Sequence, residues 1–131
     1  MIGIDTNVLV RYLTQDDPVQ SSRATRLIEG QLTEHDPGYV TTVVLAETVW
    51  VLRRGYRFTT AEVASAIERI LQVDALVVER DQEVFLALTA LRNGIASFPD
   101  ALIAALCRRA GCSRVATFDQ RASTTLGFML V

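Results

Sequence analysis

The chain opens with Met1-Ile2-Gly3-Ile4-Asp5-Thr6-Asn7, and this stretch decides the fold class. Two isoleucines lead directly into Asp5, and a helical spacing of apolar residues begins right after it. A short apolar run that ends in a carboxylate predicts a buried strand whose last residue lies at the edge of a sheet. Because ligands bind outside the carboxyl ends of the strands in open α/β folds, Asp5 is the first candidate for a functional residue.

Strands and helices are expected to alternate along the rest of the chain. Further short strands are predicted at 39–41, 75–78, 114–118 and 128–131, and apolar residues at helical spacing fill the segments between them. No tight hairpin signal is present, so the strands are expected to be parallel, with helices on both faces of the sheet. The right-handed crossover rule then places all the strand ends on one edge. The sequence therefore predicts a single α/β domain over residues 1–131.

Four glycines are expected to end helices. Gly30, Gly55, Gly94 and Gly111 each stand just past a helical run, often after arginine. This pattern is typical of a left-handed C-terminal cap with cations beside the negative end of the helix.

The composition excludes several classes of protein. Half of the 131 residues are hydrophobic and 21% are charged, which is typical of a compact globular chain. A net charge of −2 argues against binding nucleic acid by charge alone, although bound cations would allow an acidic site to act on a polyanion. All thirteen basic residues are arginine, which excludes a Walker lysine and a Schiff base.

Cys107 and Cys112 do not form a CxxC pair. With no signal-peptide pattern or spanning run, we expect a cytoplasmic protein and no membrane.

Three acidic residues stand where a strand ends or a helix begins. Asp5 and Asp119 each follow a predicted strand, and Asp100 follows Ser97 at the start of an apolar helix. Each has a simpler explanation: Asp5 as a helix cap, Asp119 as a turn former, and Asp100 as part of a capping box with Ser97.

A fourth acid, Glu47, stands in a helix expected to begin after a cap at Thr42. From Val43 to Leu52 every residue except Glu47 and Thr48 is apolar, which predicts a buried helix. No residue three or four positions away can pair with the carboxylate. A buried carboxylate without a partner is costly, so a cation is expected to supply one. An arginine from elsewhere, or protrusion of Glu47 into water, remains the alternative.

The four acids together favour a metal site. The predicted topology brings them to one edge of the sheet, where two carboxylates about 4 Å apart would repel by about 4 kcal/mol at an effective dielectric constant near 20. Hard divalent cations that prefer oxygen ligands, Mg²⁺ or Mn²⁺, remove this repulsion.

The ordered set of motifs resembles the PIN domain, and most closely the VapC-type toxins of bacterial toxin–antitoxin pairs. The motifs are Ile4-Asp5-Thr6-Asn7-Val8-Leu9, Glu47, Asp100-Ala101-Leu102-Ile103-Ala104-Ala105 and Thr117-Phe118-Asp119. The resemblance covers the whole chain. It implies a three-layer α/β/α fold with a five-stranded parallel sheet, and a metal-dependent ribonuclease whose cuts leave a 5′-phosphate and a 3′-hydroxyl.

The resemblance also implies roles for individual residues. The catalytic acids of the family carry over to Asp5, Glu47, Asp100 and Asp119. Asp5, Asp100 and Asp119 correspond to ligands of Mg²⁺, with Mn²⁺ as the alternative, whereas Asn7 and Thr117 correspond to residues that orient the site. The chain departs from many relatives at Ser97, where they carry a further acid.

The family implies an RNA substrate, a cognate antitoxin and a homodimer. The alternative function is a PIN-like module that binds RNA or protein without nuclease activity. A receiver-like phosphoacceptor would need a lysine, which the chain lacks, and a haloacid-dehalogenase phosphatase would need an acid at Asn7.

Overall fold

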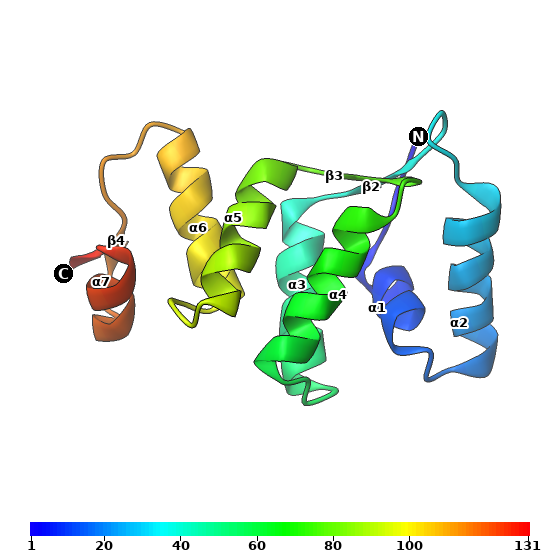
Figure 1. Ribbon diagram of the computed structural model, residues 1–131, viewed down its shortest axis with the longest axis horizontal. Coiled ribbons are helices and arrows are strands. Elements are labelled where there is room, and N and C mark those ends of the chain that lie inside the picture. The colour runs from blue at the N-terminus through cyan, green and yellow to red at the C-terminus, as the bar shows by residue number, and fades with distance from the viewer. The chain divides into compact units, whose positions relative to one another are not determined.

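The structure is a computed structural model that describes all residues from Met1 to Val131. The chain forms two compact units, 1–80 and 81–131. Figure 1 shows the order of the elements, from the N-terminal strand in blue to the last helix in red. No helix is long and apolar enough to cross a membrane.

The first unit contains a three-stranded parallel sheet. Its strands are β1 (Ile2–Gly3), β2 (Gly38–Val40) and β3 (Leu76–Val78), in the order β1-β2-β3. The pairing continues past β1, because the backbone N–H of Ile4 donates to the carbonyl of Tyr39 at 2.9 Å. Extended backbone therefore leads directly to Asp5, as the opening of the sequence predicts. The predicted burial of this strand is wrong for Ile2, which is 48% exposed because β1 lies at the edge of the sheet, whereas Ile4 is buried.

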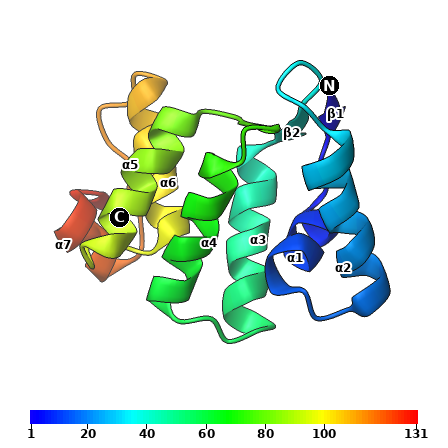
Figure 2. The same cartoon turned by 45° about the vertical axis from the view of Figure 1, so that its right-hand side comes forward.

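Five helical segments complete the first unit: α1 (Thr6–Thr14), α2 (Pro18–Thr25), the π-helical segment η1 (Arg26–Gln31), α3 (Thr42–Arg54) and α4 (Thr60–Gln72). Helix α1 packs against α2 and α3, and α3 lies beside α4 (Figure 2). The N-cap of α3 is Thr41, whose hydroxyl accepts from the backbone N–H of Val44 at 3.2 Å, and not Thr42 as the sequence suggested.

Helix α3 is buried on one face only. Leu45, Thr48, Val49 and Leu52 form that face. On the opposite side, Val43 and Trp50 remain 71% and 60% exposed. The expectation that the whole apolar helix would be buried is therefore wrong.

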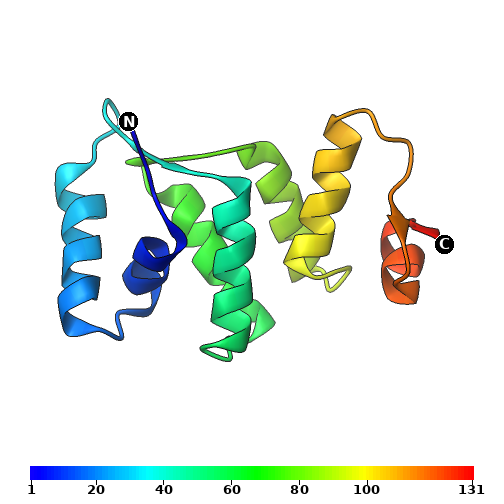
Figure 3. The same ribbon diagram turned by 180° about the vertical axis from the view of Figure 1, so that it is seen from behind.

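The second unit contains α5 (Asp81–Arg92), α6 (Phe98–Arg109), β4 (Ala116–Thr117), α7 (Gln120–Leu126) and β5 (Met129–Leu130). Strands β4 and β5 are parallel, with Ala116 opposite Met129. Helices α5 and α6 pack side by side (Figures 1 and 3), with Val84, Leu88 and Phe98 fully buried.

The alternation of helices with parallel strands is confirmed in both units. The strands form one parallel sheet of three strands in the first unit and one of two in the second. A single five-stranded sheet therefore stays a prediction, as does a single domain over residues 1–131.

Three of the four glycines end a helix as predicted, and two of them do so with the predicted left-handed backbone. Gly94 and Gly111 adopt left-handed backbone angles, with φ of 68° and 93°. Gly55 caps α3 with a right-handed φ of −83°, and Gly30 lies inside η1, which continues to Gln31. At Gly55 only the left-handed conformation is wrongly predicted, whereas at Gly30 the helix end itself is, because the chain continues past it as a π-helix.

Candidate functional site

Asp5 lies at the point where the β1 backbone turns into α1. Its φ of −81° and ψ of 158° are extended, and its Oδ1 accepts a hydrogen bond of 2.8 Å from the backbone N–H of Thr6. Asp5 is therefore the N-cap of α1, which is the simpler explanation that the sequence analysis gave for this residue. The carboxylate is exposed, and its Oδ2 accepts no hydrogen bond. Capping thus leaves one oxygen and the full negative charge available to a ligand.

Glu47 is exposed on α3, on the side of the helix that also carries Val43 and Trp50. The prediction that Glu47 is buried is wrong, because α3 turns only its other face to the core. No arginine pairs with Glu47, and its carboxylate makes no hydrogen bond. An exposed carboxylate without a partner is a usable metal ligand.

Asp5 and Glu47 line the same pocket of about 270 Å³ in the first unit. The lining also contains Thr6, Asn7 and Arg11. The Thr6 hydroxyl has no hydrogen-bond partner although the residue is only 5% exposed. Two carboxylates, an amide and a hydroxyl make a donor set of hard oxygen atoms, which is the set that Mg²⁺ and Mn²⁺ prefer.

Arg11 brings a positive charge into this pocket, but that charge is already engaged. Its guanidinium donates to both oxygens of Asp16 at 2.9 Å and to the Tyr56 hydroxyl at 3.0 Å. The hydrogen bond to Asp16 raises the pKa of Arg11. Asp16 in turn accepts from Tyr56 at 2.7 Å and from Thr14 at 2.8 Å. Because Arg11 is neutralised by Asp16, the negative charges of the pocket lack an internal counterion.

The sequence analysis did not predict this network of Arg11, Asp16 and Tyr56. Asp16 follows Arg11 by five residues, which is not a helical pairing distance, and Tyr56 is forty residues further on. A weak signal was present, since an acid just before the helix start at Pro18 is typical of a cap. That signal fits Asp17, which caps α2, and gives Asp16 no role.

Asp100 belongs to the second unit and lies in the first turn of α6. Ser97 is the N-cap of this helix, and its hydroxyl accepts from the backbone N–H of Asp100 at 3.3 Å. The reciprocal bond of a capping box, from the Asp100 carboxylate back to Ser97, is absent. The half-buried carboxylate is therefore not used in capping. Ser97 alone serves as the cap.

Asp119 is the N-cap of α7. Its Oδ1 accepts from the backbone N–H groups of Arg121 at 2.8 Å and Ala122 at 3.2 Å. The backbone N–H of Asp119 donates to the Thr117 hydroxyl at 3.0 Å. Thr117 therefore holds the backbone that carries Asp119, and the exposed carboxylate keeps one oxygen free of hydrogen bonds.

Each unit thus carries two of the four predicted acids. The structure brings Asp5 and Glu47 together in one pocket, and Asp100 and Asp119 stand at the first turns of two helices of the second unit. Neither unit gathers three or more acidic, histidine or cysteine side chains closely enough to hold a metal ion. A metal site built from all four carboxylates therefore stays a prediction.

Comparison with known proteins bears on the whole chain. A family model described as the PIN domain matches residues 2–125. Among solved structures, the chain is similar to Mycobacterium tuberculosis VapC20, described as a sarcin–ricin loop cleaving toxin. The identity is 23%, the TM-score is 0.46, and the match covers 100% of this chain and 98% of that chain. No match was found among the curated proteins.

Proposed function

The chain belongs to the PIN domain family, and on this basis we propose that it is a metal-dependent endoribonuclease, the toxin of a type II toxin–antitoxin pair. The observation that carries the proposal is the pocket that Asp5 and Glu47 line together. Both carboxylates are exposed and unpaired with any cation, while the only guanidinium in the pocket is neutralised by Asp16. A polyanionic substrate approaches such a pocket only when a cation is bound there as well.

The candidate residues offer carboxylate oxygens, which are the ligands that a hard divalent cation prefers. We propose that Asp5, Asp100 and Asp119 hold Mg²⁺, with Mn²⁺ as the alternative. When bound, the ion supplies positive charge against the phosphate and makes a water molecule more acidic. The single domain over residues 1–131 and the five-stranded sheet are part of the same proposal, since both bring Asp100 and Asp119 into the catalytic set.

The chain's own groups have distinct tasks in this proposal. The Glu47 carboxylate, which has no other partner, accepts a hydrogen bond from the attacking water and orients it toward the phosphorus. Asn7, on the first turn of α1 beside Asp5, orients the Asp5 carboxylate. Thr117 holds the Asp119 backbone through its 3.0 Å hydrogen bond.

Three further expectations belong to this proposal. A cognate antitoxin inhibits the enzyme by covering the acidic pocket, two copies of the chain form a homodimer, and the protein acts in the cytoplasm. The side chains of Val43 and Trp50, which are exposed on the same side of α3, support an interface, because exposed apolar surface is typical of contact sites.

The first prediction tests the ribonuclease directly. Purified wild-type protein should cleave total RNA with Mg²⁺ and lose this activity in EDTA. Asp5→Asn should lower the cleavage rate by more than the roughly 10- to 100-fold cost of losing an outer-shell group, because a direct ligand is lost. An asparagine oxygen still caps α1, so the thermal midpoint should stay close to that of the wild type.

The matched control is Asp74→Asn, which also removes one negative charge. Asp74 lies in the same unit as Asp5, is exposed and has no partner. It should cleave RNA at the wild-type rate. Equal cleavage by Asp5→Asn and Asp74→Asn would refute the assigned site. RNA binding without any cleavage would instead favour the alternative, a PIN-like binding module.

A further inference from the structure

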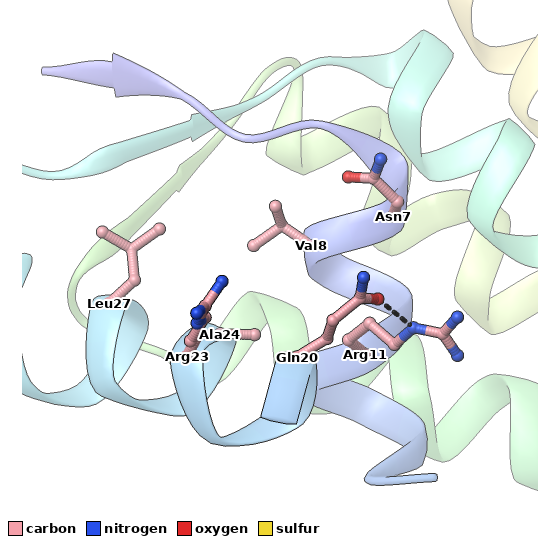
Figure 4. Close-up of a pocket in the computed structure, with 7 residues that line it drawn as sticks. All are labelled: Asn7, Val8, Arg11, Gln20, Arg23, Ala24 and Leu27. Atoms are coloured by element: carbon pink, nitrogen blue, oxygen red, sulfur yellow. Dashed lines mark hydrogen bonds between the residues drawn. The ribbon is translucent and has the colours of Figure 1, made fainter. Parts of the chain in front are cut away.

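A second pocket of about 270 Å³ adjoins the acidic one. It lies between α1, which contributes Val8, and the α2–η1 segment, which contributes Gln20, Arg23 and Leu27 (Figure 4). Asn7 and Arg11 line both pockets, so the two are neighbours along α1. The two pockets therefore lie on either side of these two residues of α1.

Apolar and polar side chains both line this second pocket. Figure 4 shows Leu27 on the η1 side and Val8 facing it from α1, with Arg23 and Ala24 of α2 between them and Gln20 beside Arg11. Gln20 accepts a hydrogen bond of 2.8 Å from Arg11 Nε through its Oε1, drawn dashed in Figure 4. This bond fixes the side-chain amide and leaves both of its N–H donors free. A flat apolar ring with acceptors on its edge matches these surfaces.

Arg23 supplies the free positive charge of this pocket. It is exposed and makes no hydrogen bond or ion pair, in contrast to Arg11, whose charge is neutralised by Asp16. Guanidinium groups bind phosphate oxygens in a bidentate geometry. An unpaired arginine next to an acidic pocket thus marks a place for a phosphate at some distance from the scissile one.

We propose that this second pocket is a subsite for one unpaired RNA nucleotide next to the bond that is cleaved. The base lies against Val8 and Leu27, the Gln20 amide donates to its edge, and Arg23 binds its phosphate. The pocket is close to the lower size limit of ligand clefts, about 300 Å³, so it accommodates a single base. The inference rests on the proposed ribonuclease function and assigns the α2–η1 segment to substrate binding. The nucleotide held there is unpaired, because stacked bases in a duplex cannot enter a pocket.

The experiment measures RNA binding separately from cleavage. The full chain carrying Asp5→Asn serves as the parent, and a short fluorescent single-stranded RNA is titrated by anisotropy between about 50 and 200 mM salt. Arg23→Gln in this parent should weaken binding, and the slope of log affinity against log salt should fall by about 0.7, the value for one lost phosphate contact on a single strand.

The matched control is Arg26→Gln, which removes the same charge three residues later. Arg26 is also exposed and without a partner, but it lines a different pocket, together with Gln15 and Pro18. This control should leave the salt slope of the parent unchanged. A fully paired RNA of the same sequence should bind more weakly than the single strand, and Arg23→Gln should not change its affinity. Circular dichroism confirms that both variants are folded, and Arg23→Ala replaces Arg23→Gln if the latter is not.

The outcomes separate this subsite from the ribonuclease proposal. Equal salt slopes for Arg23→Gln and Arg26→Gln, tight binding of the duplex, or no RNA binding by the parent would each overturn the subsite, even if the wild type cleaves RNA. A fall in the salt slope confined to Arg23→Gln would support nucleotide binding in this pocket even if the wild type cleaves nothing. The ribonuclease proposal, and with it the place of the pocket next to a cleaved bond, would then fail.

Discussion

At the scale of single residues, the central feature is that the acidic pocket keeps its negative charge. Asp5 uses one oxygen to cap α1 and Glu47 uses none, whereas Arg11 is bound by Asp16. The motif around Asp5 is local, so the sequence predicts its place at a strand end and offers the helix cap as an alternative role. The pairing of Arg11 is not local, because Tyr56 reaches it from beyond α3.

The second prediction concerns the pH dependence that Asp16 confers. Hydrogen bonds from Tyr56 and Thr14, followed by the bond from Arg11, hold the pKa of Asp16 far below its usual value of 3.8. A folded-state pKa below that of the unfolded chain stabilises the fold above pH 3.8, and this contribution is lost as the pH falls below that value. Asp16→Asn should therefore lower the thermal midpoint at pH 7, and the difference from the wild type should shrink toward pH 2.

This prediction is checked by recording melting curves of both proteins across that pH range. Asp74→Asn is the control, since Asp74 has no partner, and it should change the midpoint little at any pH. A midpoint difference for Asp16→Asn that stays constant down to the lowest pH would contradict the assigned role of Asp16.

At the scale of elements, helix α3 shows why composition misleads about burial. Its apolar residues outnumber the positions that face the core, so Val43 and Trp50 remain exposed beside Glu47. The sequence could predict the helix and the unusual carboxylate within it. It could not predict which side faces outward, because an all-apolar surface has no preferred side until neighbouring elements pack on it.

The third prediction compares two glycines with opposite surroundings. A Cβ at Gly38, the first residue of β2, would stand 2.8 Å from side-chain carbons of Ile4 and Leu32, both buried. Gly38→Ala should therefore lower the free energy of unfolding by about 1–3 kcal/mol, as overpacking does. A Cβ at Gly30 in η1 meets no atom within 4 Å, and the backbone there is not left-handed.

Gly30→Ala should thus be neutral or raise the free energy of unfolding by about 0.4–1 kcal/mol, because it restricts the unfolded chain. Urea denaturation of the three proteins measures both effects. The explanation would be wrong if Gly30→Ala destabilised the protein as much as Gly38→Ala did.

At the scale of the whole molecule, two units each carry two of the proposed catalytic acids. The fourth prediction links metal binding to folding. An ion that binds only the folded chain raises its stability by about 2.7 kcal/mol at a concentration of about 100 times Kd. Mg²⁺ should therefore raise the thermal midpoint of the wild type, and EDTA should reverse the change.

Mg²⁺ should raise the thermal midpoint of Asp5→Asn by less than that of the wild type, because one proposed ligand is lost. It should raise the midpoint of Asp74→Asn by the full amount. Scanning calorimetry with and without Mg²⁺ measures all three. An equal rise in the three proteins would indicate general screening of an acidic chain and would argue against a metal held at Asp5.

The sequence by itself determined the features that depend on neighbouring residues: the alternation of strands and helices, the caps at Asp5 and Ser97, and the left-handed turns at Gly94 and Gly111. Hydrogen bonds and backbone angles within one or two turns of the chain decide these features. Only the tertiary structure decided that Glu47 is exposed, that it shares a pocket with Asp5, and that Arg11 pairs with Asp16 and Tyr56. These facts depend on which segments pack together, and packing brings together residues whose separation along the chain carries no local pattern.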